Sequence, residues 1–157
     1  MFKLVVHEMF VLYNNRLRIS MPFITKQFKF CAAHKYWNDN WSENKNNEIF
    51  EDDVKVHGHN YELDITLRGH INKESGFVVN ISKLKDIVNK YAVHLLDHTE
   101  IQKDIDWFIG KQPSTENLVL FIWDQIVNRI PDGAKLYKIK LRETPTIYTE
   151  YYGPDGE

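Results

Sequence analysis

The feature that most constrains the fold is a strict alternation of side chains in the segment HGHNYELDITLRG, residues 57–69. One set of alternate positions, which becomes apolar after its first two members, consists of His57, His59, Tyr61, Leu63, Ile65 and Leu67. Successive side chains of a strand point to opposite faces, so this pattern predicts a strand with one face in the core and one in water. A strand of this kind is typical of an antiparallel sheet that is covered on one side.

Three further segments carry strand patterns. Residues 23–32 place Ile24, Phe28 and Phe30 on one face, and an extension of the same alternation brings His34 onto it. In residues 135–143 the apolar face predicted by alternation consists of Tyr137, Ile139, Leu141 and, at its end, Glu143. Residues 146–152 follow a turn at Thr144-Pro145, which predicts a hairpin with the preceding strand.

Two segments have the periodicity of amphipathic helices. The first runs from Ser82 to about Leu96, can be capped by Asn80 or Ser82, and has a stripe of Leu84, Ile87, Val88, Tyr91 and Leu95. The second follows Pro113-Ser114-Thr115, ends at Pro131-Asp132-Gly133, and has a stripe of Leu118, Ile122, Ile126 and Ile130. The order strand–strand–helix–helix–strand–strand predicts an α+β fold, an antiparallel sheet with two helices on one side.

Composition narrows the class of protein. A chain of 157 residues is about the size of one domain, and its formal net charge of −2 gives no electrostatic footprint for nucleic acid. No apolar run approaches the roughly 20 residues that span a membrane, and residues 1–20 lack a signal-peptide cleavage site. We therefore expect a cytoplasmic protein. The single cysteine, Cys31, excludes an intramolecular disulfide and a zinc site built from cysteines.

One segment, residues 38–55, differs from the rest in composition because it holds six acids, two lysines and five asparagines. Two interpretations remain open for it. It is either a solvated loop or a mobile lid beside a functional site, since loops on a rigid scaffold often carry function.

The candidate chemistry centres on histidines and acids. His57 and His59 share one strand face, and they are either a surface pair or metal ligands, with His34 as the best third ligand. Three histidines and a water would form an open, catalytic type of zinc site. Glu143 ends an apolar face, so it is either a solvated rim residue or a group that holds a ligand through N–H donors. The histidine of the Asp97-His98 pair is explained equally well by a helix C-terminus.

Five motifs taken together give a more specific indication: FKFCAAH (28–34), HGHNY (57–61), LLDH (95–98), PSTEN (113–117) and ETPT (143–146). In their order and approximate spacing the chain resembles the 6-pyruvoyltetrahydropterin synthase family, including its 6-carboxytetrahydropterin synthase branch. The resemblance runs from about Met21 to Gly153, which predicts one domain over 21–157 preceded by an extension, residues 1–20.

The resemblance implies a tunnelling fold, in which four-stranded sheets from several subunits close into a barrel, and a homo-oligomer that is a hexamer. It implies that zinc is the cofactor and that a pterin, 7,8-dihydroneopterin triphosphate, is the substrate, which loses triphosphate. The implied zinc ligands are His34, His57 and His59. Glu143 would anchor the pterin ring, framed by Thr115 and Glu116, while Asp97 and His98 would form an acid/base relay.

The chain departs from the family pattern at the catalytic base. Family members that eliminate triphosphate carry a cysteine shortly before the HGH motif, where this chain has Glu51 and Asp53. A related class that cleaves the pterin side chain has a glutamate about three residues before the HGH motif, where this chain has Val54. A carboxylate is a weaker base than a thiolate by about 4–5 pKa units, a gap that burial and a metal would narrow.

Our hypothesis is that Asp53, or a neighbouring acid (Glu51 or Asp52), is the base. Cys31 has the wrong strand parity to replace the missing thiol. Two alternatives stay open: an enzyme that cleaves the side chain of a dihydroneopterin to a hydroxymethyl pterin, and a non-catalytic paralogue that binds zinc and pterin.

Overall fold

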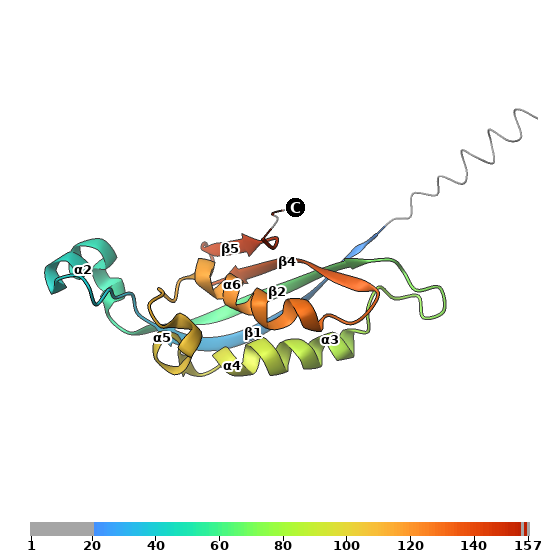
Figure 1. The fold of residues 1–157 in the computed structure, drawn as a ribbon, viewed down its shortest axis with the longest axis horizontal. Coiled ribbons are helices and arrows are strands. Elements are labelled where there is room, and N and C mark those ends of the chain that lie inside the picture. The colour runs from blue at the N-terminus through green and yellow to red at the C-terminus, as the bar shows by residue number, and fades with distance from the viewer. Residues whose placement is uncertain (1–20, 155, 157) are drawn as a thin grey trace, which may run out of the picture.

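In a computed structural model, which describes residues 21–154 and 156, five strands form one sheet in the order β3-β1-β2-β4-β5 (Figure 1). The strands are β1 (Phe23–His34), β2 (His57–Gly69), β3 (Thr99–Glu100), β4 (Ala134–Arg142) and β5 (Tyr148–Tyr151). The predicted antiparallel sheet of four strands is confirmed, and β3 adds a two-residue parallel edge to β1. The proposed extension, residues 1–20, lies outside the described residues.

The helices pack against one face of this sheet. The first is a continuous helical segment made of α3 (Ile81–Val88), η2 (Asn89–Val93) and α4 (His94–Leu96), and the second is α6 (Thr115–Ile126) followed by η4 (Val127–Arg129). Short turns, α5 (Ile101–Asp104) and η3 (Asp106–Phe108), connect them. Asn80 and Ser114 cap the two helices through side-chain oxygens that accept backbone N–H groups. Buried residues of both helices and of the inward sheet face form one hydrophobic core.

In the first helix one residue predicted to lie in the core does not lie there. Leu84 and Val88 are fully buried as expected, but Leu95 is 42% exposed and Leu96 is fully buried in its place. The reason is the π-helical turn η2, which adds one residue to the helix and so advances every later side chain by one position. A periodicity of 3.6 residues cannot anticipate that insertion.

A β-bulge in β4 changes a second predicted position, because Tyr137 does not lie on the core face of that strand. Along β2 and β4, Thr66 pairs with Lys138 but Leu67 pairs with Leu136, so Tyr137 is an extra residue without a partner in β2. The bulge moves Leu136 onto the core side and Tyr137 onto the opposite face, where its ring packs against that of Phe23 at 4.5 Å.

The acidic segment 38–55 is not the loop that its composition suggested. It contains the helix α2 (Glu43–Phe50) and the 3-10 turn η1 (Glu51–Val54), which extend beyond the end of the sheet (Figure 1). Ser42 caps α2, and Asn46, a residue of this helix, is completely buried. Side-chain hydrogen bonds to a buried amide thus order a segment that has few apolar residues.

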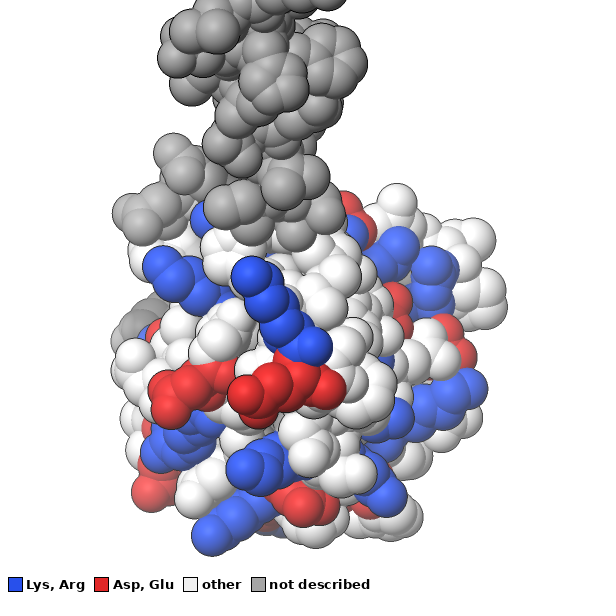
Figure 2. All heavy atoms as spheres, turned by 90° about the vertical axis from the view of Figure 1, so that its right-hand side faces the viewer, with Lys and Arg blue, Asp and Glu red and all other residues white. Residues whose placement is uncertain are grey.

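The face of the sheet that the helices leave open is a polar ladder. Cross-strand pairs run along it, from Thr25–Thr66 at 2.8 Å to Lys29–Glu62 at 3.0 Å and Lys138–Glu150 at 3.0 Å. Acidic and basic side chains also alternate over the end of the molecule where β1 begins (Figure 2). Among the described helices, none is long and apolar enough to cross a membrane.

Candidate functional site

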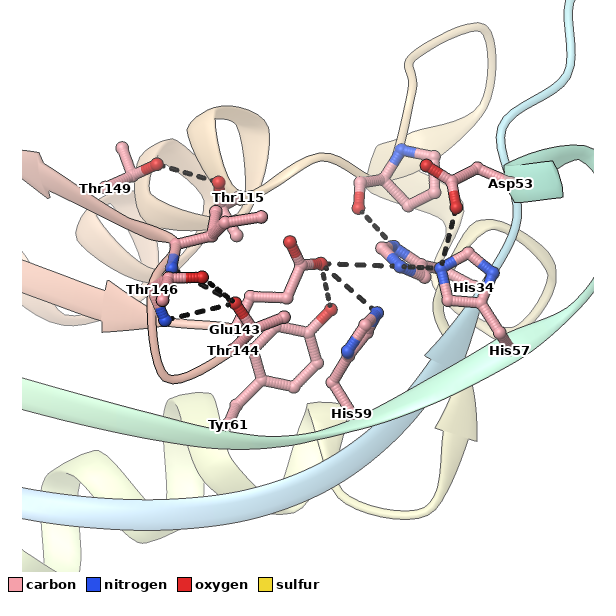
Figure 3. Close-up of polar contacts among 12 residues, drawn as sticks. His34, Asp53, His57, His59, Tyr61, Thr115, Glu143, Thr144, Thr146 and Thr149 are labelled. Carbon is pink, nitrogen blue, oxygen red and sulfur yellow. Dashed lines mark hydrogen bonds and ion pairs between the residues drawn. The ribbon is translucent and has the colours of Figure 1, made fainter. Parts of the chain in front are cut away.

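Three histidines converge at the end of the sheet from which α2 extends (Figure 3). His34 is the last residue of β1 and pairs directly with His57, the first residue of β2, while His59 follows on the same face. One ring nitrogen from each residue lies within 4.8 Å of the others, and the Nε2 atoms of His34 and His57 are 3.1 Å apart. The structure therefore brings together all three predicted ligands.

Backbone carbonyls orient two of these rings. Nδ1 of His34 lies 2.8 Å from the carbonyl oxygen of Pro113, and Nδ1 of His57 lies 2.9 Å from that of Lys55. A carbonyl oxygen can only accept, so each Nδ1 carries a proton, and in the neutral form of each ring Nε2 presents a lone pair. This second contact of a histidine is the one that usually fixes its tautomer in metal sites.

The cluster has an excess of acceptors, which fits a cation. The Nε2 lone pairs of His34 and His57 face each other, and the buried Nε2 of His59 makes no hydrogen bond within the described part of the chain. Burial lowers the pKa of both His34 and His59, and His57 lowers both further, so these rings favour the neutral form that binds metals. Three neutral imidazoles form a donor set suited to zinc.

Glu143 completes the inner side of the cluster. Its Oε1 atom lies 3.4 Å from Nε2 of His34 and 3.6 Å from Nε2 of His59, and it accepts a hydrogen bond of 3.2 Å from the hydroxyl of Tyr61. The Glu143 side chain is only 10% exposed. Of the two interpretations of Glu143, the solvated rim residue is therefore wrong: the carboxylate faces the histidines.

The structure separates the three candidate bases. Asp53 presents Oδ1 at 3.7 Å from Nε2 of His57 (Figure 3), and its side chain is 56% exposed. Asp52 points into solvent, 93% exposed, and pairs with Lys55 at 2.8 Å. Glu51 is also exposed. Asp53 is thus the acid of this segment that the structure joins to the histidines.

Thr115 and Glu116 open α6 on the other side of the cluster. Thr115 is buried, and its hydroxyl lies 2.7 Å from that of Thr149 in β5, so it fixes the helix to the sheet. Glu116 is exposed, with Oε2 at 3.4 Å from the hydroxyl of Thr115. The structure therefore gives Thr115 a structural hydrogen bond, while the side chain of Glu116 is accessible to solvent.

The predicted relay lies apart from this cluster. Asp97 accepts a 2.8 Å hydrogen bond from the N–H of Cys31 and lies 3.0 Å from Nδ1 of His98. The hydrogen bond from Cys31, with His98 beside it, holds the pKa of Asp97 below its usual range. His98 has a left-handed backbone, φ 61°, and an 82% exposed side chain at the edge of the sheet. Within the described residues no hydrogen bond or ion pair joins this dyad to the three histidines.

Two tyrosines at the site are not among the predicted residues. Tyr61 shares the strand face of His57 and His59, so alternation alone could have identified it. Tyr36 packs edge-on against His34 at 5.2 Å. Burial and the nearby charges of three acids raise the pKa of Tyr36; these acids are Glu143, Asp53 and Glu116. Tyr36 thus lies where the acidic groups of the site meet, which only the folded chain could show.

A hollow opens beside the cluster. It has a volume of about 640 Å³ and is lined by His59, Asn60, Glu143 and Thr144, among others. That size lies within the range of about 300–1,000 Å³ typical of small-molecule sites. The site therefore combines a metal-competent histidine cluster, a nearly buried carboxylate and a cavity of ligand size.

An antiparallel sheet with two helices on one face and three histidines at its end defines the class: a protein with a potential metal site and a pocket for a small molecule. Comparison with known families makes the class specific. The family model described as 6-pyruvoyl tetrahydropterin synthase matches residues 23–154. The chain belongs to this family, as its motifs predicted.

Relatives agree with this assignment. The chain is 36% identical over 136 residues to a 6-pyruvoyl tetrahydrobiopterin synthase of Drosophila melanogaster, covering 85% of this chain and 81% of that protein. It is 32% identical over 114 residues to a dihydroneopterin monophosphate aldolase of Pyrococcus furiosus, covering 73% and 82%. A Caenorhabditis elegans 6-pyruvoyl tetrahydropterin synthase structure matches with a TM-score of 0.80 and 27% identity, covering 86% of this chain and 97% of the other. The predicted four-stranded sheet with helices is thus the fold of this family.

Proposed function

We propose that this protein is a zinc-dependent lyase that acts on 7,8-dihydroneopterin triphosphate, eliminating triphosphate and rearranging the pterin side chain. The observation that carries the proposal is the convergence of three Nε2 atoms and one Glu143 oxygen beside a cavity of ligand size. The family supports pterin chemistry, and the donor set supports the metal.

His34, His57 and His59 would hold the zinc ion through Nε2, since two of the three Nδ1 atoms are already bound to carbonyls. When bound, zinc supplies Lewis acidity that polarises the side-chain hydroxyls of the substrate. Burial lowers the pKa of His34 and His59, which favours the neutral, metal-binding form of these two rings.

Glu143 would orient the substrate. A carboxylate that is 10% exposed can accept paired hydrogen bonds from the 2-amino group and ring N–H of a pterin at little cost in further desolvation. The hydroxyl of Tyr61 holds one of its oxygens, which restricts rotation of the carboxylate. Pterin binding there would place the side chain of the substrate toward the histidines.

Asp53 would remove the side-chain proton. Its Oδ1 lies 3.7 Å from Nε2 of His57 and its side chain is 56% exposed, so a substrate whose side chain reaches the histidines from solvent would also meet this carboxylate. General base catalysis of this kind is typically worth about 10²–10⁴-fold in rate.

Asp97 and His98 would act on a substrate held by a neighbouring subunit. The dyad is exposed at the sheet edge and makes no direct contact with the histidines in the described chain. A barrel of several subunits, as the resemblance implied, would bring one subunit's edge to another's site. A homo-oligomer, the hexamer that the resemblance implied, is therefore part of the proposal.

A second candidate function is cleavage of the side chain of a dihydroneopterin. The similarity to the Pyrococcus furiosus aldolase favours it, together with a carboxylate rather than a thiol beside the histidines. Both reactions begin with removal of a proton from the substrate, so the same site serves either.

One experiment separates these functions. The zinc-loaded protein is incubated with dihydroneopterin triphosphate and with a dihydroneopterin, and the products are identified by mass spectrometry. Triphosphate release with the carbon chain intact supports the lyase, whereas a hydroxymethyl pterin and a two-carbon fragment support cleavage. No product from either substrate would overturn both and leave a protein that binds zinc and pterin.

A further inference from the structure

The segment that follows β1 is held by side chains in place of a neighbouring strand. Three consecutive backbone N–H groups, those of Tyr36, Trp37 and Asn38, donate to three different parts of the chain. Tyr36 N–H donates to the carbonyl of Asp53 at 2.9 Å. The other two are taken up by side-chain amides, which also donate back to the carbonyls of the same residues. Each amide therefore reproduces the paired contacts of a strand.

The first amide is Gln112. Its Oε1 accepts from Trp37 N–H at 3.1 Å and its Nε2 donates to the Trp37 carbonyl at 2.9 Å. Its own carbonyl accepts from the side chain of Asn117 at 2.9 Å, so Gln112 is fixed at both ends. The next residue is Pro113, whose carbonyl accepts the Nδ1 proton of His34. Gln112 thus holds the peptide that determines which nitrogen of His34 faces the cluster.

The second amide is the buried Asn46. Its Oδ1 accepts from Asn38 N–H at 2.8 Å and its Nδ2 donates to the Asn38 carbonyl at 3.0 Å. This contact fixes α2 to Asn38, the last of the three residues. Phe50, at the end of α2, stacks on Trp41 with ring centroids 5.7 Å apart. The turn that follows carries Asp53. Asn46 thus holds the helix that leads into the candidate base.

We propose that Gln112 and Asn46 are positioning residues with separate roles: Gln112 orients His34 through Pro113, and Asn46 places Asp53 through α2. The inference rests on the proposed function for the role of Asp53, but the orientation of His34 can be measured without it. Removing either amide leaves a backbone N–H and a carbonyl unpaired, so the segment would move away from that contact.

The test uses the full chain with Gln112→Ala, Asn46→Ala and the conservative Asn46→Asp. The last keeps an acceptor for Asn38 N–H and loses the donor. Asn72→Ala is the matched control, because the Asn72 side chain also accepts two backbone N–H groups but lies in the loop at the opposite end of the sheet. Each variant is first examined without metal by ¹H–¹⁵N NMR of its imidazoles and of the amides of residues 36–38.

For Gln112→Ala we expect the slowly exchanging Nδ1–H signal of His34 to be lost or averaged. Zinc affinity, measured by competition with a chelator, should fall by about 10–100-fold, as for other outer residues of metal sites. The turnover rate at saturating zinc should stay within a few-fold of the parent. An unchanged His34 signal and unchanged zinc affinity would overturn the role of Gln112.

For Asn46→Asp we expect the opposite pattern. Exchange of the Tyr36 amide should accelerate while the retained acceptor keeps the Asn38 amide protected, zinc affinity should stay within a few-fold, and kcat should fall by about 10-fold or more with little change in KM. If Asn46→Ala does not fold, Asn46→Asp alone decides the outcome. An equal loss of zinc affinity and kcat in both variants would indicate a general structural role and overturn the proposal.

The design distinguishes failure of this inference from failure of the proposed function. If the parent protein binds no zinc or converts no pterin, the proposed function is wrong, and the NMR signals of His34 and of residues 36–38 still decide whether the two amides position them. If the parent binds zinc and turns over while neither variant shows its own pattern, only the inference is wrong. In either case Asn72→Ala should behave as the parent.

Discussion

Nε2 of His34 lies 3.1 Å from Nε2 of His57, and Nδ1 of each ring meets a backbone carbonyl. When both rings are neutral their protons lie on Nδ1, so the two Nε2 atoms present lone pairs to each other. This arrangement is suited to a metal cation held by both rings, and its consequences can be measured.

Acid should destabilise the metal-free protein. Burial lowers the pKa of His34 and His59 below the usual 6.5, so below that pH the unfolded chain takes up protons that the folded chain resists. The free energy of unfolding should then fall with decreasing pH by up to about 1.4 kcal/mol per pH unit for each proton. Urea unfolding from pH 8 to pH 5 with a chelator present measures the slope. His34→Gln should flatten it, and an identical slope would contradict the assignment.

Zinc should raise the stability of the protein. A ligand that binds only the folded state, at a free concentration of 100 times its dissociation constant, adds about 2.7 kcal/mol to the free energy of unfolding. Thermal unfolding with and without zinc measures this gain, which His59→Gln should largely abolish. His70→Gln, a change of an exposed histidine in the loop after β2, is the matched control and should keep the gain. An equal loss in both variants would argue against the three-histidine site.

Neighbouring aspartates should differ in their effect on turnover. Asp53→Asn removes the carboxylate beside His57, and kcat should fall by about 10²-fold or more if it is the general base. Asp52→Asn changes a surface carboxylate that pairs with Lys55, so kcat should stay within about 2-fold. Steady-state kinetics of the zinc-loaded variants compares them. Full turnover by Asp53→Asn would remove Asp53 from the mechanism.

Two inactive variants should restore activity when combined. His98→Ala damages the exposed dyad, and Asp53→Asn damages the histidine cluster of the same chain. If the dyad of one subunit serves the site of another, subunits mixed after reversible dissociation form some sites with both groups intact. Activity should then reappear in the mixture but in neither variant alone. A mixture that stays inactive would place both groups in one subunit's site.

Two glycines with similar backbones should respond differently to alanine. Gly153 has φ 92°, and a Cβ there would lie 2.7 Å from the ring of Trp123, whereas Gly133 has φ 91° and open space around it. Gly133→Ala should cost about 1–2 kcal/mol for the left-handed backbone. Gly153→Ala should cost a further 1–3 kcal/mol or so for the clash. Urea unfolding gives both values, and equal costs would show that Trp123 moves aside freely.

The alternation of residues 57–69 predicted both the strand and the face on which His57 and His59 lie, because side-chain direction in a strand follows from the backbone alone. The alternation of residues 23–32 placed His34 on the core face of its own strand, and β1 pairs His34 directly with His57. The sequence also limited the helix caps to Asn80 or Ser82 and to Ser114 or Thr115, since caps depend on residues close in sequence, and the structure shows Asn80 and Ser114 in that role. The motifs then identified the family.

Predictions failed where one residue was inserted into a regular element. The π turn of the first helix exchanged Leu95 for Leu96 in the core, and the bulge in β4 exchanged Tyr137 for Leu136. A period counted along the chain does not record either insertion.

The sequence by itself determined the sheet, the two covering helices, the three histidines and Glu143, because each follows from a local period or a motif. Only the tertiary structure decided that Asp53 rather than Asp52 faces the histidines and that the Asp97-His98 dyad lies at the sheet edge. It also ordered the acidic segment through Asn46. These outcomes depend on the three-dimensional path of the backbone, which sets the direction of each side chain in the turn η1 and brings Cys31 N–H to Asp97, and composition and spacing do not record that path.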